Sequence, residues 1–154
     1  MMEIITGIMG NYIIRVAFLS WLTAQILKTL INFYLTKDFS PERLVGAGGM
    51  PSSHTAFVVS TAIATARQCG VSSTEFALSA VLASVVIYDA MGVRRAAGEQ
   101  AKILNKMIDE WLDKTYWSEK SLPQIKRLKE MLGHTPLEVL GGIVVAVVIS
   151  ILAV

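Results

Sequence analysis

The sequence predicts an all-α, polytopic membrane helix bundle with about four transmembrane helices plus an amphipathic surface helix. The 154 residues are 53% hydrophobic and only 17% charged, and their mean hydropathy is +0.54, which is more apolar than a typical soluble domain. The apolar residues collect in four blocks of helix length, and most of the charges lie between the third and the fourth. No repeat or long linker interrupts the chain, so one membrane-embedded domain is expected over residues 1–154.

The four apolar blocks cover residues 12–36, 54–70, 74–92 and 136–154. The first exceeds the roughly 20 residues that a helix needs to cross the hydrocarbon of a bilayer, and the last is nearly pure aliphatic residues and glycine. The second block is shorter and more polar, so neighbouring helices should shield it from lipid. Residues 1–10 lack the basic start and cleavage site of a signal peptide and are expected to belong to the mature chain.

Residues that are typical of helix starts stand at the beginning of the third and fourth blocks. Ser72 with Glu75, and Thr135 with Glu138, each predict a capping residue followed by the acidic residue of a capping box. Between the third and fourth blocks, the apolar and the charged residues of 98–113 each recur at helical spacing. They would therefore lie on opposite faces of an amphipathic helix. We expect this helix to lie against the membrane surface.

Four spans would place the loops 37–53 and 93–133 on one side of the membrane and both termini on the other. The loop side carries most of the basic residues: Lys37, Arg43, Arg94, Arg95, Lys102, Lys106, Lys114, Lys120, Lys126, Arg127 and Lys129. Basic loops favour the cytoplasm. The loops are therefore predicted to be cytoplasmic.

Several classes of function receive no support. The single cysteine, Cys69, has no partner for a disulfide or for a zinc site at the usual ligand spacing. A formal net charge of +2, with basic residues mixed among acidic ones, does not indicate nucleic-acid binding.

Two charged residues lie within the apolar blocks, where an unpaired charge is costly. Lys28 lies inside the first block and Asp89 near the end of the third. Function is the first interpretation of both. The alternatives are that Lys28 extends its amine to the membrane surface and that Asp89 forms an ion pair with Arg94 or Arg95.

The run 48–54, GGMPSSH, enters the second block. Its glycines, proline and serines would direct free backbone N–H groups, including that of Gly49, toward one point, which suits an anion. Ser53 adds a hydroxyl, and His54 adds an imidazole that exchanges protons near neutral pH. A simple glycine and serine helix cap is the alternative.

His134 and Glu138 lie four residues apart at the start of the last block. One helical turn could join them, and a carboxylate on one ring nitrogen fixes the tautomer and makes the other nitrogen a better nucleophile. The alternative is a capping box with His134 merely preceding it. However, the chain has only two histidines, and the predicted topology places both at the same mouth of the bundle. Arg94 and Arg95 lie on that side too, as phosphate ligands or as membrane-surface anchors.

With these motifs, the chain resembles the type 2 phosphatidic acid phosphatase (membrane acid phosphatase) superfamily, and in particular its small divergent branch. Residues 51–54, PSSH, are similar to the proline-serine-glycine-histidine motif of the superfamily, and residues 134–139, HTPLEV, to its histidine end. Residues 92–95, GVRR, with 98–101, GEQA, and Leu104-Asn105 resemble the divergent branch. The resemblance covers most of the chain.

The resemblance implies a hydrolase that removes phosphate from a lipid through a phosphohistidine intermediate. His134 would attack phosphorus, His54 would act as acid and then base, and Glu138 would orient His134. Lys28, Gly49, Ser53 and Arg94 or Arg95 would hold the phosphoryl oxygens, and Asp89 could support them. No metal or cofactor is implied.

The substrate class that follows from the resemblance is a phospholipid or isoprenoid phosphate: phosphatidylglycerophosphate, phosphatidate or a polyprenyl diphosphate. We expect a multi-pass protein of the bacterial inner membrane with its active site on the cytoplasmic face; a homo-oligomer is left open. The alternative functions are a non-hydrolytic carrier of anionic lipid headgroups and a membrane scaffold.

Overall fold

The computed structural model describes residues 2–37, 49–114, 127–128, 130 and 132–153. These residues form helices and no strand, in agreement with the predicted all-α membrane bundle. The helices are α1 (Met2–Gly10), α2 (Tyr12–Thr36), α3 (Ser53–Cys69), α4 (Thr74–Met91), α5 (Val93–Lys114) and α6 (Pro136–Leu152). Among the basic residues that oriented the predicted topology, Arg43, Lys120, Lys126 and Lys129 lie outside the described residues.

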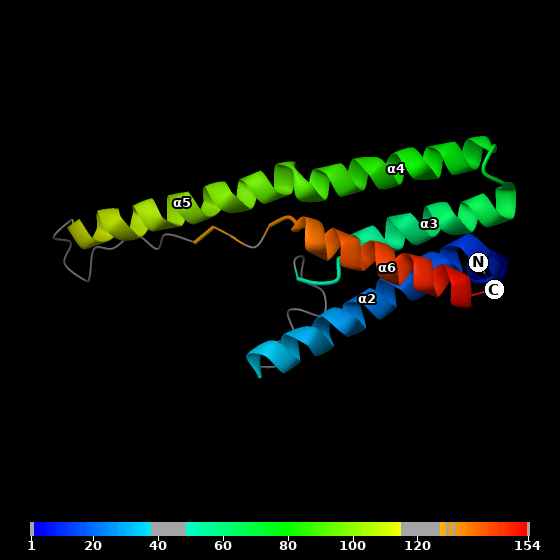
Figure 1. The fold of residues 1–154 in the computed structure, drawn as a ribbon, viewed down its shortest axis with the longest axis horizontal. Helices are drawn as coiled ribbons and strands as arrows, with labels where there is room; N and C mark the ends of the chain where they lie inside the picture. The colour runs from blue at the N-terminus through cyan, green and yellow to red at the C-terminus, as the bar shows by residue number, and fades with distance from the viewer. Residues whose placement is uncertain (1, 38–48, 115–126, 129, 131, 154) are drawn as a thin grey trace.

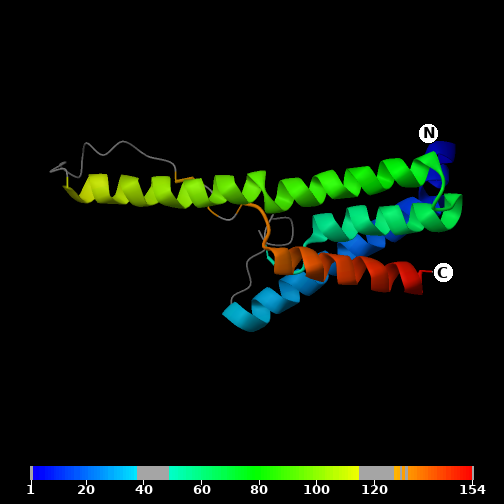
Figure 2. The same ribbon diagram turned by 45° about the horizontal axis from the view of Figure 1, so that its top comes forward.

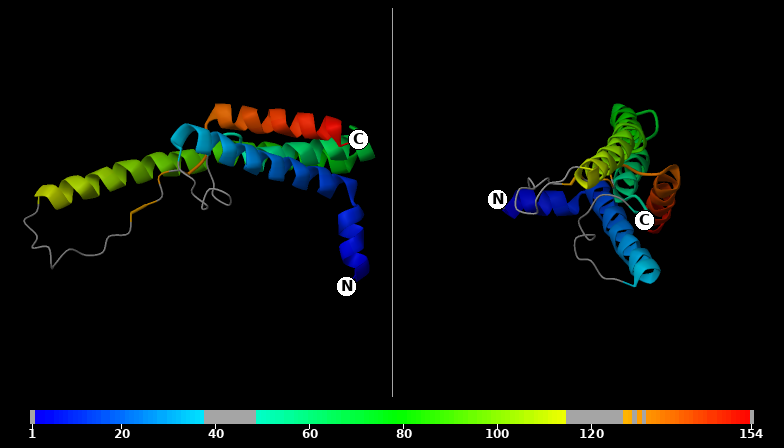
Figure 3. Two further views of the ribbon diagram at one scale, coloured as in Figure 1. Left: turned by 90° about the horizontal axis from the view of Figure 1, so that it is seen from below. Right: turned by 90° about the vertical axis from the view of Figure 1, so that its left-hand side faces the viewer.

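Helix α3 is central to the bundle. It contacts α2, α4 and α6, which is the shielding that its polar composition predicts. Both termini and the turn between α3 and α4 lie at one end of the bundle, and the starts of α3 and α6 lie at the other (Figure 1). Helix α1, which is not among the predicted helices, leaves the bundle at a steep angle to α2 (Figure 3).

Small residues fill the interior, and large apolar residues cover the outside. The buried alanines Ala17, Ala24, Ala56, Ala64 and Ala146 come from α2, α3 and α6, while no leucine, isoleucine or phenylalanine is buried among the described residues. Membrane helices pack through small residues and turn their large apolar side chains to lipid. A soluble protein of this size would not leave so much apolar surface in water. The packing therefore matches a membrane solvent.

Two helices are long and apolar enough to cross a membrane, counting only the described residues: 12–35, and the continuous stretch 74–111 formed by α4 and α5. Helix α6 is apolar but has 17 residues. Helix α3 also has 17 residues and is more polar. Contacts with α2, α4 and α6 shield the polar residues of α3.

Two details differ from the sequence predictions. The N-cap of α4 is Ser73, whose hydroxyl accepts from the backbone N–H of Phe76, and not Ser72. Helix α5 begins at Val93 instead of residue 98 and extends the line of α4 away from the bundle (Figures 1 and 2). The amide of Gly92 bonds to the carbonyl of Tyr88, and the carbonyl of Gly92 accepts from Ala96, so helical hydrogen bonding passes through the junction. As a result, α5 does not fold across the end of the bundle.

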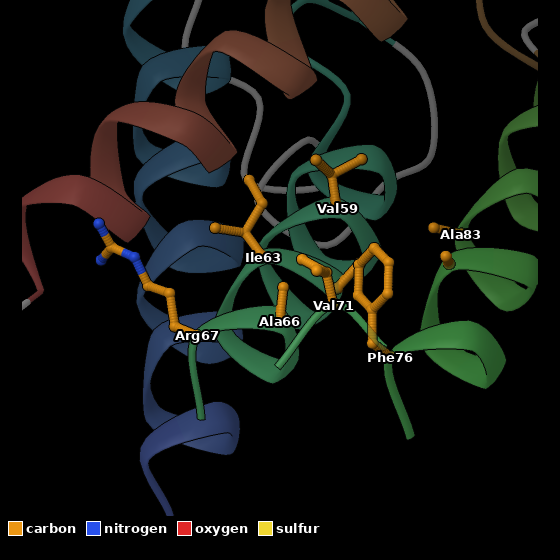
Figure 4. Close-up of a pocket in the computed structure, with 9 residues that line it drawn as sticks. Val59, Ile63, Ala66, Arg67, Val71, Phe76 and Ala83 are labelled. Atoms are coloured by element: carbon orange, nitrogen blue, oxygen red, sulfur yellow. The ribbon is translucent and has the colours of Figure 1, made fainter. Parts of the chain in front are cut away.

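An open, apolar pocket of about 450 Å³ lies between α3 and α4, toward the end that holds their connecting turn. Val59, Ile63 and Phe76 line it, and Arg67 reaches past it toward α6 (Figure 4). There the guanidinium of Arg67 donates to the carbonyl oxygen of Ser150. The arginine therefore ties the end of α3 to α6.

Candidate active site

Three segments far apart in the sequence meet at the end of the bundle opposite the termini: the start of α3, the junction of α4 with α5, and the start of α6 (Figure 1). They bring His54, Asp89, Arg94 and His134 around one pocket of about 210 Å³. The prediction that both histidines share one mouth of the bundle agrees with this arrangement.

His134 is held by the first turn of α6. Its Nδ1 lies 2.9 Å from Oε2 of Glu138, and the imidazole is 5% exposed. A carboxylate only accepts hydrogen bonds, so in the neutral imidazole Nδ1 carries the proton and Nε2 keeps its lone pair. The same Oε2 accepts from the backbone N–H of Thr135 at 3.0 Å, and the Thr135 hydroxyl caps the N–H of Glu138. The capping box and the oriented histidine, which the sequence posed as alternatives, are both present.

His54 follows the first residue of α3 and faces His134 across the pocket. The centroids of the two rings are 6.3 Å apart, with their planes inclined at 50°. That separation leaves the rings out of direct hydrogen-bonding contact while both line the same pocket. A small tetrahedral group could lie between two such nitrogens.

Arg94 contributes the positive charge of the pocket. Its Nε donates to Oδ2 of Asp89 at 2.5 Å, an ion pair that the sequence offered as one interpretation of Asp89. A guanidinium has further donors on its terminal nitrogens, and Arg94 also lines the pocket. Arg95, the other candidate, is exposed and does not line the pocket.

Lys28, Gly49 and Ser53 lie beside this pocket, not among the residues that line it. Lys28 is 4% exposed, and its aliphatic stem packs against Gly49, where a Cβ would be 3.4 Å from Cγ of the lysine. The lysine lies close enough to Glu138 and His54 for their charges to interact. Ser53 is buried in the first turn of α3. All nine predicted site residues therefore lie at one end of the bundle, but in two groups.

Backbone contacts that the sequence did not reveal join these segments. The amide of Ser52, the N-cap of α3, donates to the carbonyl of Glu138 at 2.9 Å, and the amide of His134 donates to the carbonyl of Ala90 at 2.9 Å. Gly142 permits the first contact, because a Cβ there would be 2.5 Å from the carbonyl oxygen of Ser52. Close packing of α6 on the start of α3 thus sets the position of Glu138.

Within the described part of the chain, no three His, Cys, Asp or Glu side chains are grouped so that they could hold a metal ion. The polar groups of the pocket are instead two imidazoles, a guanidinium and a carboxylate. The imidazoles and the guanidinium can donate hydrogen bonds to an oxyanion such as phosphate, while the Asp89 carboxylate is paired with Arg94.

Comparison with known proteins decides the family. The model of the Divergent PAP2 family matches residues 9–149. The chain belongs to this family. A relative, the uncharacterized membrane protein YuiD of Bacillus subtilis, is 38% identical over 125 residues, which cover 77% of this chain and 78% of the relative. No solved structure matches the chain.

The matched range includes every candidate residue of this divergent PAP2 protein, from Lys28 to Glu138. It also includes the whole bundle from α2 to most of α6. Among the described residues, the two helices that are long and apolar enough to cross a membrane, and the small-residue core, agree with a membrane bundle.

Proposed function

We propose that this divergent PAP2 protein is a metal-independent phosphatase that hydrolyses a lipid phosphate through a phosphohistidine intermediate. The observation that carries the proposal is the pair of histidines on one pocket, with His134 fixed through Nδ1 by Glu138. An imidazole held in this way presents Nε2 as a nucleophile, and a second imidazole across the pocket can move the protons.

The reaction has two steps. In the first, Nε2 of His134 attacks phosphorus, a P–N bond forms, and the P–O bond to the lipid breaks as His54 protonates the leaving oxygen. In the second, His54 takes a proton from water, whose oxygen attacks phosphorus and breaks the P–N bond. Inorganic phosphate leaves, and both imidazoles return to their starting state.

Electrostatics supply the rest of the proposed mechanism. Phosphoryl transfer depends mainly on positioning and on stabilising charge over the phosphoryl oxygens. Arg94 lines the pocket, and Lys28 lies near enough to interact with His54. Asp89 holds Nε of Arg94 and so orients its remaining donors toward the phosphoryl group.

The surroundings of the pocket support a lipid substrate. Val85 lines the pocket and is also 59% exposed on the apolar outer surface of α4. A pocket with this border can admit a headgroup from the bilayer without removing the tail from lipid. Phosphatidylglycerophosphate, phosphatidate and polyprenyl diphosphates all have this form.

We further propose a multi-pass arrangement in a bacterial inner membrane, with α2, α3, α4 and α6 spanning and the pocket on the cytoplasmic face. The pocket end carries Lys37, Arg94, Arg95, Lys102 and Lys106 among the described residues. Basic residues on one side favour a cytoplasmic placement.

Phosphate release from a panel of lipid phosphates tests the function. The protein is assayed in detergent micelles with a chelator present, beside His134→Ala and the control Leu137→Ala, which changes an exposed neighbour in the first turn of α6. We expect chelator-resistant release from wild type and Leu137→Ala, and none from His134→Ala. A folded wild type that binds phosphate but releases none from any lipid would instead favour a carrier or scaffold.

A further inference from the structure

The segment that leads into His134, which we call the return segment, lies along one face of α5 where the structure describes it. The described part of this return segment consists of Arg127, Leu128, Glu130 and residues 132–134. It ends at His134, the proposed nucleophile. The contacts that hold the return segment against α5 therefore also affect the position of His134.

The side chain of Asn105 forms hydrogen bonds with the return segment. Asn105 is 4% exposed, its Oδ1 accepts from the amide of Leu128 at 3.1 Å, and its Nδ2 donates to the carbonyl of Leu128 at 3.0 Å. Nδ2 also donates to the Glu130 carboxylate at 2.7 Å. One carboxamide thus satisfies both backbone groups of Leu128, as a neighbouring strand would. One turn further along α5, Asp109 accepts from Arg127 at 2.7 Å.

Nearer the site, the return segment packs directly on the backbone of α5. A Cβ at Gly98 would lie 2.7 Å from the carbonyl oxygen of Glu130 and 2.8 Å from that of Leu132. Gly133 has φ +82° and fits against the backbone of Arg94 and Arg95, where a Cβ would be 2.4 Å from the amide nitrogen of Arg95. The next amide, that of His134, is bonded to Ala90.

These contacts follow one stripe of α5. Asp109, Asn105, Gly98 and Arg94 are separated by four, seven and four residues, so they share a helix face. The same stripe reaches the pocket at Arg94. One face of α5 therefore positions the described residues of the return segment: Arg127, Leu128, Glu130 and residues 132–134.

We infer that Asn105 and Gly98 are positioning residues for catalysis: they fix the return segment on α5 and so hold His134 at the distance and orientation that attack on phosphorus requires. This inference deepens the proposed function and rests on it for its effect on turnover. Small displacements of a reacting group slow a reaction strongly, and a shift of about 1 Å can lower the rate on the order of 100-fold.

Two variants disrupt the contacts between α5 and the return segment by different means. Asn105→Ala deletes the carboxamide, whereas Gly98→Ala removes no polar group and inserts a methyl into the contact with Glu130 and Leu132. Alanine favours a helix more than glycine does, so Gly98→Ala should leave α5 helical. Gln100→Ala, an exposed residue of the same helix, is the control.

The first readout is independent of turnover. The chain has two histidines, so side-chain ¹⁵N NMR of the full chain in detergent micelles gives two imidazoles, which His54→Gln assigns. We expect Asn105→Ala and Gly98→Ala to alter or broaden the His134 ring signals while those of His54 stay near their wild-type values. We also expect kcat to fall on the order of 10- to 100-fold with little change in KM. Gln100→Ala should change neither.

Several results would overturn the inference. One is a His134 signal that matches wild type in both variants, and another is an equal change in both histidines, which would indicate general loosening. If Asn105→Ala does not fold, Gly98→Ala decides the matter alone. Wild-type release of phosphate with unaltered kcat in folded variants contradicts this inference only, whereas a wild type with no release contradicts the proposed function and leaves the NMR test of positioning in force.

Discussion

Nδ1 of His134 and Oε2 of Glu138 lie 2.9 Å apart across one turn at the start of α6. The same carboxylate oxygen also accepts from the amide of Thr135. One side chain therefore caps a helix and orients the proposed nucleophile, and the two roles can be separated by mutation.

Glu138→Gln keeps a carbonyl oxygen for the Thr135 amide but removes the negative charge that stabilises a charged His134. We expect kcat to fall by roughly 100- to 10,000-fold, as when the orienting carboxylate of a hydrolytic triad is lost, with little change in thermal stability. Phosphate release and thermal denaturation in detergent measure the two effects.

Thr135→Ala is the converse variant. It removes the hydroxyl that caps the Glu138 amide, and the loss of such a cap lowers stability by about 0.5–2 kcal/mol. The contact between His134 and Glu138 remains, so kcat at a temperature where the protein is folded should be close to that of wild type. If Thr135→Ala loses as much kcat as Glu138→Gln, the capping role alone explains Glu138.

The two adjacent arginines are predicted to differ. Arg94 lines the pocket and Arg95 does not, so Arg94→Ala should reduce kcat/KM by about 100- to 1,000-fold, the range seen when a transition-state donor is removed. Arg94→Lys should recover little, because an ammonium lacks the planar fork that binds two oxygens. Steady-state kinetics of Arg95→Ala provide the matched control, and a loss there as large as in Arg94→Ala would contradict the assignment.

Adjacent glycines of α6 provide a test of how the site is assembled. A Cβ at Gly142 would lie 2.5 Å from the carbonyl oxygen of Ser52, whereas one at Gly141 would meet only the side chains of Pro51 and Met50, at 3.3 Å or more. We expect Gly142→Ala to lower stability by about 1–3 kcal/mol, as overpacking does, and to reduce turnover. Gly141→Ala should be far milder in both assays; equal effects would show that the contact with Ser52 is not what joins α6 to α3.

The orientation in the membrane can be read from cysteine labelling. Cys69 is exposed at the end of α3, away from the histidines. In intact cells a membrane-impermeant maleimide should label Cys69 from outside, and it should label Gln100→Cys in a Cys69→Ser background only after the cells are opened. The reverse pattern would place the pocket on the outer face.

Strong local signals made much of the fold predictable. The block 12–36 has the bounds of α2, and the capping box at Thr135 fixed the start of α6. Choices between equivalent neighbours were not predictable. Ser72 and Ser73 are both good caps, and only the fold selects Ser73.

In the candidate site, too, local contacts could be predicted from the sequence and contacts that depend on the fold could not. The spacing of His134 and Glu138 is local, so one helical turn predicts their contact. The choice of Arg94 over Arg95 depends on how α5 leaves α4. The contacts of Gly142 and Gly133 depend on segments far away in the chain, and no local pattern encodes them.

The most direct test of the central claim is to trap the phosphorylated histidine. His54→Gln removes the proposed base for the second step, so a phosphate ester with a good leaving group, which needs no acid, should still phosphorylate His134 but release phosphate slowly. Rapid quenching in alkali, where a phosphohistidine survives, followed by mass spectrometry should find one phosphoryl group on His134 in His54→Gln and none in His134→Ala. Phosphate release by wild type with no adduct on His134 in His54→Gln would contradict the covalent mechanism.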